Sequence, residues 1–174
     1  MNIEGENIMK LCSFYVSDWH LVTMLLPYIN RKINEKEKIV TVLENDIKNN
    51  VETLVKRLNL RNEEEILNID WSKRDNYLSI NKLLNNNIEE NIIIIVNGTK
   101  EYIKEANKNI DTIIEKNRDK INQKNIKIIN CYEIVEFNGS IVEILDNHDK
   151  ILNTSGEKEI NEVFEDYTKS EKIS

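Results

Sequence analysis

The most apolar run in the chain lies near its middle, from Asn91 to Gly98, and consists mainly of β-branched residues. An unbroken run of this kind is typical of a strand covered on both faces, because a strand with one wet face alternates apolar with polar residues. Such strands lie in the middle of parallel sheets. We therefore predict a central strand that ends at Asn97 and Gly98, on the edge where open α/β sheets bind their ligands.

Shorter apolar runs alternate with helical patterns along the rest of the chain. They predict strands over residues 8–15, 38–43, 66–71 and 126–134, each followed by apolar residues at helical spacing. The predicted helix starts are Ser17 or Asp18, the cluster Glu44-Asn45-Asp46, Ser79, Thr99 and the turn Asn138-Gly139-Ser140. This alternation predicts an α/β fold with three layers: a mostly parallel central sheet of about five or more strands, with helices on both faces.

Two local features modify this outline. Pro27, the only proline, removes a backbone donor inside the first helix and should bend that helix near Thr23. After Gly156 the chain is strongly charged, and this composition predicts a frayed helix. We expect a single sensory-type α/β domain over residues 1–156 and a charged tail over residues 157–174.

Length and charge narrow the class of protein. A chain of 174 residues with 40% hydrophobic content suits one domain with a real core. The net charge of -7 and the pI of about 5.1 argue against direct binding to nucleic acid, which needs a basic surface. No window approaches the ~20 apolar residues of a membrane span, and Glu4 and Glu6 stand where a secretory signal is basic. We expect a cytoplasmic protein away from the membrane and leave a homo-oligomer open.

The residues that usually bind metals or act as nucleophiles are few and scattered. Cys12 and Cys131 each lie in an apolar segment and are typical of buried, reduced thiols. With His20 and His148 they show no paired ligand spacing, so neither a metal site nor a cofactor is expected. The many Asn, Ile and Lys residues are typical of an AT-rich genome, and runs such as Asn85-Asn86-Asn87 are therefore given little weight.

The motifs of nucleotide chemistry are incomplete. A phosphate loop needs glycines between the first strand and helix, but the connection from Val16 to His20 has none and carries Asp18, which repels phosphate. Gly98-Thr99-Lys100 resembles the end of such a loop, yet Ile93 stands where its first glycine should be. A receiver domain would need a lysine after the fifth strand, where this chain has Tyr132-Glu133.

Polar and aromatic residues nevertheless gather at the predicted carboxyl ends of the strands. Together they could line a crevice that recognises a small ligand through aromatic walls and a few hydrogen bonds. Each of them taken singly is also typical of a cap or a turn. The candidate ligand-binding residues are Tyr15, Ser17, Asp18, Glu44, Asn45, Trp71, Asn97, Gly98, Thr99 and Tyr132.

Short motifs near both ends of the chain are informative when taken together. The opening motifs are Cys12-Ser-Phe-Tyr15, Leu26-Pro27-Tyr28-Ile29 and the strand that ends at Glu44-Asn45. The closing motifs are Cys131-Tyr132, Phe137, Ile144-Leu145 and His148. Together they resemble the MEDS (DcmR-like) family of bacterial sensory domains. The chain differs from the family at Lys10, where a histidine is usual, at Gly98-Thr99-Lys100, where a Gly-Glu-Met-like element is usual, and at Asp149, where proline is usual.

The resemblance implies an α/β fold similar to RecA and KaiC ATPases, with a degenerate nucleotide site. We therefore expect a non-catalytic sensory or regulatory domain in bacterial signal transduction, which binds a small ligand or a signalling protein. One alternative is a degenerate nucleotide-binding protein or an enzyme that uses Asp18, Glu44 and Thr99. Another is a structural subunit that binds a partner through its acidic tail and the helix after Thr99.

Overall fold

The apolar run at the middle of the chain forms the centre of a seven-stranded sheet. In the computed structural model, which describes residues 7–134 and 141–168, Ile92 to Gly98 are all buried. The strand order is β3-β2-β4-β5-β1-β6-β7. The five inner strands are parallel, and the edge strands β3 and β7 are antiparallel to their neighbours. Ile94 of the central strand pairs with Val40 on one side and with Ile128 on the other.

The described elements follow one another along the chain as β1 (Ile8–Tyr15), α2 (Asp18–Asn34), β2 (Lys38–Leu43), α3 (Lys48–Leu58), α4 (Glu63–Leu67), β3 (Arg74–Asp75), α5 (Tyr77–Leu84), β4 (Glu90–Gly98), α6 (Lys100–Lys116), the 3₁₀ turn η1 (Ile121–Gln123), β5 (Lys124–Glu133), α7 (Ile141–Asp146), β6 (Lys150–Asn153), β7 (Gly156–Lys158) and α8 (Ile160–Val163).

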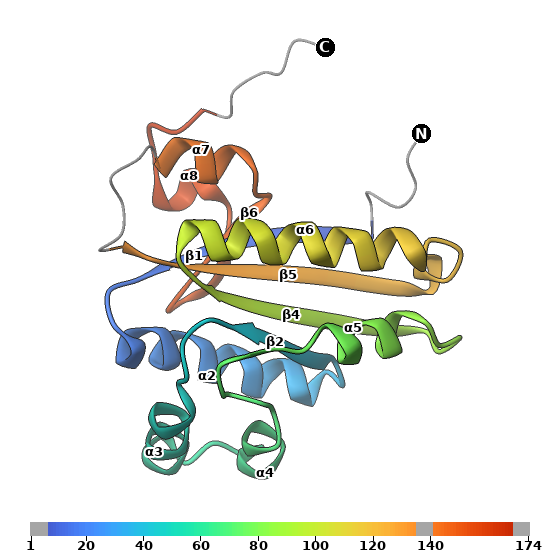
Figure 1. The fold of residues 1–174 in the computed structure, drawn as a ribbon. Helices are drawn as coiled ribbons and strands as arrows, with labels where there is room; N and C mark the ends of the chain where they lie inside the picture. Colours follow the sequence, from blue (N-terminus) through green and yellow to red (C-terminus); the bar gives the residue numbers. More distant parts are fainter. Residues whose placement is uncertain (1–6, 135–140, 169–174) are drawn as a thin grey trace.

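Helices cover both faces of the sheet, as Figure 1 shows with α6 and α7 on one side and α2, α3 and α4 on the other. The chain crosses from β1 to β2 in one direction along the sheet and returns through β4 and β5 to β6 in the other. Right-handed crossovers in opposite directions place their helices on opposite faces. Each face has its own apolar core, one against α2 and α3 and the other against α5, α6 and α7. The three-layer α/β architecture predicted from the sequence is confirmed.

Most of the predicted elements are also confirmed. β1 and β2 have the predicted bounds, and β5 begins two residues before its predicted start. Ser17 and Thr99 are the N-caps of α2 and α6, and each accepts a hydrogen bond from a backbone N–H three residues on. α2 continues through the exposed Pro27. The predicted turn at Asn138-Gly139-Ser140 lies outside the described residues.

Three local predictions are wrong. Residues 66–71 form no strand: Ile66 and Leu67 end α4, whose first turn is stabilised by three acidic residues, and residues 68–71 form an irregular connection. Ser79 lies inside α5, whose N-cap position is Asn76. The charged stretch after Gly156 is no single frayed helix, since β7 pairs with β6 before α8 begins. None of the described helices is long and apolar enough to span a membrane.

Candidate ligand-binding site

The carboxyl ends of β1, β5, β4 and β2 lie along one edge of the sheet, since these strands are parallel neighbours. The connections after β1 and β2 lead to helices on one face, whereas those after β4 and β5 lead to helices on the other. Crevices for ligands form where neighbouring connections separate in this way. Most of the predicted ligand-binding residues come from these strand ends.

A compact cluster of hydrogen bonds joins the ends of β2 and β4. The backbone N–H of Glu44 donates to the carbonyl oxygen of Asn97 (3.0 Å) and to its Oδ1 (3.1 Å). The carboxylate of Glu44 in turn accepts from the backbone N–H of Thr99 at 2.7 Å. Gly98 has a φ of +152°, and a Cβ there would lie 2.6 Å from Glu44 Oε1 and 2.8 Å from Tyr102 Cδ1. The corner is therefore packed closed around the glycine.

Glu44 thereby occupies the N-terminal end of α6. The free N–H groups and the dipole of a helix N-terminus attract an anion. Here the carboxylate takes one of those N–H groups, and Thr99 Oγ1 takes another by accepting from the backbone N–H of Tyr102 at 3.2 Å. An external phosphate would have to compete with a negative charge already in place.

The N-terminal end of α2 is filled in the same way. The hydroxyl of Ser17 accepts from the backbone N–H of His20 (3.2 Å), and Nδ1 of His20 accepts from the backbone N–H of Val16 (3.0 Å). Asp18 adds a carboxylate in the first turn. Two backbone donors that a phosphate loop would aim at its ligand are thus bound by the chain's own side chains.

Two buried polar atoms at this edge, the hydroxyl of Tyr15 and Nδ2 of Asn97, have no hydrogen-bond partner among the described residues beyond their contact with each other. Both side chains are fully buried. Burial raises the pKa of the Tyr15 phenol, the nearby Cys131, Glu133 and Asp18 raise it further, and the amide of Asn97 offsets part of the rise. The phenol therefore stays protonated and remains available as a hydrogen-bond donor.

The other predicted residues are divided between different places. Trp71 is buried beneath α3 and α4, where its Nε1 donates to the carbonyl oxygen of Ile66 at 2.8 Å. Tyr132 lies on the opposite face of the sheet, with its ring centroid 5.9 Å from those of Phe14 and His148. Asn45 is half-buried beside Glu44. The structure joins Glu44, Asn97, Gly98 and Thr99, with Tyr15 near them, and places Ser17 and Asp18 at α2.

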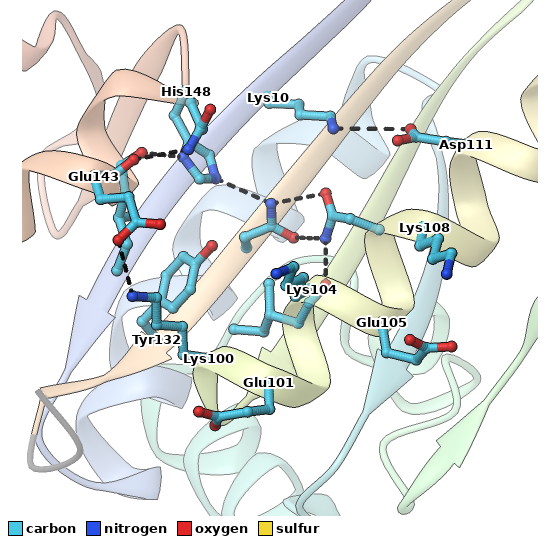
Figure 2. A pocket seen from close by; sticks show the side chains of 15 residues that line it. Lys10, Lys100, Glu101, Lys104, Glu105, Lys108, Asp111, Tyr132, Glu143 and His148 are labelled. Carbon is cyan, nitrogen blue, oxygen red and sulfur yellow. Dashed lines mark hydrogen bonds and ion pairs between the residues drawn. The ribbon is translucent and has the colours of Figure 1, made fainter. Parts of the chain in front are cut away.

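A second candidate site is a cavity of about 770 Å³ between α6 and α7, above β5 and β1 (Figure 2). Its floor is a chain of polar side chains. Asn107 and Asn130 exchange two hydrogen bonds of 2.8 and 3.1 Å, and Nδ2 of Asn130 lies 3.0 Å from Nε2 of His148. Nδ1 of His148 lies 2.6 Å from the carbonyl oxygen of Ile144, which can only accept. We assign the ring proton to Nδ1, so that Nε2 accepts from Asn130.

Two ion pairs bound this cavity at opposite ends. Lys10 of β1 lies 3.8 Å from Asp111 of α6, and Lys100 of α6 lies 3.2 Å from Glu143 of α7. Lys104 lies between Lys100 and Asp111 along α6, and its exposed side chain also lines the cavity (Figure 2). Tyr132, one of the predicted ligand-binding residues, lines the inner wall.

The described residues offer little for metal or thiol chemistry. No group of three or more His, Cys, Asp and Glu side chains within residues 7–134 and 141–168 is placed to hold a metal ion. Cys12 and Cys131 are both buried and free, as predicted. Burial raises the pKa of Cys12 to about 12 and raises that of Cys131 as well. Both thiols are therefore protonated near neutral pH and are poor nucleophiles.

Sequence reasoning missed the asparagines. The run that was given little weight holds a buried lysine, since Lys124 Nζ donates to Oδ1 of Asn86 (2.7 Å) and to the carbonyl oxygen of Ile88 (2.6 Å). Asn130 stands inside the apolar run of β5 and is 2% exposed. A polar residue at a core position of a strand needs a partner, and that signal was present in the sequence.

No family model matches the chain, and a search of the curated proteins finds no match. The resemblance to the MEDS family therefore remains a prediction from the motifs quoted above.

Proposed function

We propose that the chain is a non-catalytic sensory or regulatory domain of the bacterial cytoplasm, which binds a small ligand or a signalling protein. The observation that carries this proposal is the filling of both helix N-termini at the carboxyl edge of the sheet. Glu44 occupies the end of α6, and Ser17, Asp18 and His20 occupy the end of α2.

The fold class adds support. The chain is an α/β fold with a mostly parallel sheet and helices on both faces, the class that the MEDS resemblance implies. In a phosphate-loop ATPase the phosphates bind at the N-terminus of the helix after the first strand. Here that helix is α2, whose end carries a carboxylate and no glycine loop. An α/β fold with this edge filled suits a protein that binds and signals rather than one that hydrolyses nucleotides.

The test is a titration with ATP and GTP, each with Mg²⁺, followed by calorimetry, together with an assay for released phosphate. We expect neither binding nor hydrolysis. A thermal-shift screen against metabolites, with pull-downs from a bacterial lysate, should then identify a ligand or a signalling partner. A screen without any stabilising compound, combined with pull-downs that retrieve no signalling protein, would remove the sensory proposal.

The second candidate is a degenerate nucleotide-binding protein or an enzyme that uses the crevice at the carboxyl edge. It is favoured by the hydroxyl of Tyr15 and the amide of Asn97, two buried groups that contact each other, have no further hydrogen-bond partner among the described residues and could bind a polar ligand. ATP or GTP affinity that disappears in Glu44→Ala would support this alternative over a sensor. The matched control is Glu52→Ala, which removes a carboxylate from inside α3.

A further inference from the structure

The cavity between α6 and α7 has the features of a built site. It is formed by four segments far apart in the sequence: β1, α6, β5 and α7. Its floor residues Asn130 and His148 are only 2% and 3% exposed, and their hydrogen bonds tie all but β1 together. Because those bonds hold the floor residues in place, the floor is rigid before any ligand arrives.

Only some of the charged side chains around the cavity form ion pairs. Four lysines and four acidic residues line it. Asp111 and Glu143 are already engaged with Lys10 and Lys100 at its two ends. The remaining acids, Glu101 and Glu105, project away from the floor in Figure 2. They therefore contribute less negative charge to the interior than the formal count suggests.

Among the described residues that line the cavity, Lys104 and Lys108 are the lysines without an ion pair. Lys104 lies one helical turn from Lys100 and one from Lys108, so the three lysines follow one another along one side of α6. The side chain of Lys104 is exposed and lines the cavity (Figure 2). An unpaired lysine with a lysine on either side attracts an anion.

The inner wall suits the rest of a ligand. Tyr132 supplies an aromatic ring and Ile103 and Ile144 supply apolar surface next to the asparagine floor. A volume of about 770 Å³ is within the range of small-molecule sites. A bare inorganic ion would leave most of this space unused, whereas a small organic anion would fill it.

We propose that the cavity between α6 and α7 is the binding site of a small organic anion, whose carboxylate or phosphate group is held by Lys104 with help from Lys100. The body of the ligand lies against Tyr132. This inference deepens the proposed function and rests on it, because it names the site and the chemical class of the sensed ligand. It also assigns the site to the face opposite α2, away from the corner at Glu44.

The test compares benzoate and phenyl phosphate with benzamide, an uncharged analogue of benzoate, on the full chain. We expect both anions to raise the thermal midpoint and to perturb backbone NMR signals of α6 and α7, at concentrations up to about 10 mM. Benzamide should do neither, and added salt should weaken the binding of both anions. The stronger of the two anions then shows whether the site prefers a carboxylate or a phosphate.

The matched variants are Lys104→Met and Lys116→Met, which remove the same charge from the same helix inside and outside the cavity. Lys104→Met should weaken anion binding about tenfold or more, and Lys116→Met should leave it unchanged. The inference is overturned if neither anion binds, if benzamide binds equally well, or if Lys104→Met binds like the original chain.

The two proposals fail in different ways. Anion signals that map to Glu44 and Thr99 instead of α6 and α7 would overturn this site and leave the sensory function standing. Binding and hydrolysis of ATP would overturn the sensory function whatever occurs at Lys104.

Discussion

At the scale of single residues, the corner at Gly98 shows how a local conformation closes a potential site. The positive φ of this residue is one that L side chains rarely adopt, and the carboxylate of Glu44 lies where a Cβ would point. Gly156 also has a positive φ, of +104°, but its nearest obstacle is the flexible end of Arg31 at 3.3 Å. Comparing substitutions at the two glycines therefore distinguishes the cost of backbone strain from the cost of steric conflict.

Gly98→Ala should lower the free energy of unfolding by about 2–4 kcal/mol, because strain and overpacking act together. Gly156→Ala should cost about 1–2 kcal/mol, since strain acts there with little conflict. Urea unfolding of the two variants measures both values. Equal costs would show that Glu44 and Tyr102 give way without penalty, and the closed corner would then be softer than its packing suggests.

Glu157 is a residue whose ionisation should affect the stability of the fold in acid. Burial disfavours its charge, but hydrogen bonds from Lys127 (2.7 Å) and Tyr28 (2.6 Å), with the charges of Lys127 and Lys32, outweigh burial and lower its pKa. A carboxyl whose pKa is lower in the folded state stabilises the fold above its unfolded pKa. That contribution is lost as the pH falls through the folded pKa.

Glu157→Ala should therefore cost about 1–3 kcal/mol at neutral pH, because it leaves Tyr28 and Lys127 without their shared acceptor. The cost should shrink as the pH falls below the range in which the carboxyl ionises. Urea unfolding as a function of pH measures it, with the exposed Glu162→Ala as the control. A cost that does not depend on pH would show that Glu157 acts through packing alone.

At the scale of elements, the chain His148-Asn130-Asn107 ties α7, β5 and α6 together. α7 has only six residues, too few to be stable by itself in water. Its apolar residues Ile144 and Leu145 are buried on the sheet, and His148 adds a polar contact just beyond its last turn. The burial of His148 and its bond to Asn130 follow from the packing of α7 on β5.

His148→Ala should lower the free energy of unfolding by about 1–3 kcal/mol, because a buried amide hydrogen of Asn130 loses its acceptor. Backbone amides of α7 should also exchange with solvent faster. The control is Asn147→Ala, which changes the exposed neighbour and should stay within about 0.5 kcal/mol. Unchanged stability and exchange would mean that apolar contacts alone hold α7.

At the scale of the whole molecule, the segment after Gly156 completes the sheet and one of the two cores. β7 pairs with β6 at the edge, Ile160 is 5% exposed, and Phe164 packs against Phe14 at a ring-centroid distance of 6.3 Å. The charged composition of this segment conceals these contacts, because its apolar residues are few and widely spaced.

A chain that ends at Gly156 should lose at least about 3 kcal/mol of unfolding free energy, since Ile160 alone is a buried aliphatic side chain. Thermal unfolding followed by circular dichroism measures the loss. Ile160→Ala in the full chain should reproduce a substantial part of it. A shortened chain as stable as the full one would contradict these contacts and would support an autonomous domain over residues 1–156.

The sequence by itself determined the architecture. The unbroken apolar run of β4 indicates a strand buried on both faces, and the helical spacing of apolar residues identifies α2, α3 and α6. It also determined the caps at Ser17 and Thr99, whose hydrogen bonds span only three residues. The tertiary structure decided what the strand ends do. Glu44 and Thr99 are 55 residues apart, and Asn107 and His148 belong to different elements, so their bonds depend on strand order and crossover direction. That is why the edge predicted as a crevice is packed closed at Gly98, and why the open cavity lies between α6 and α7.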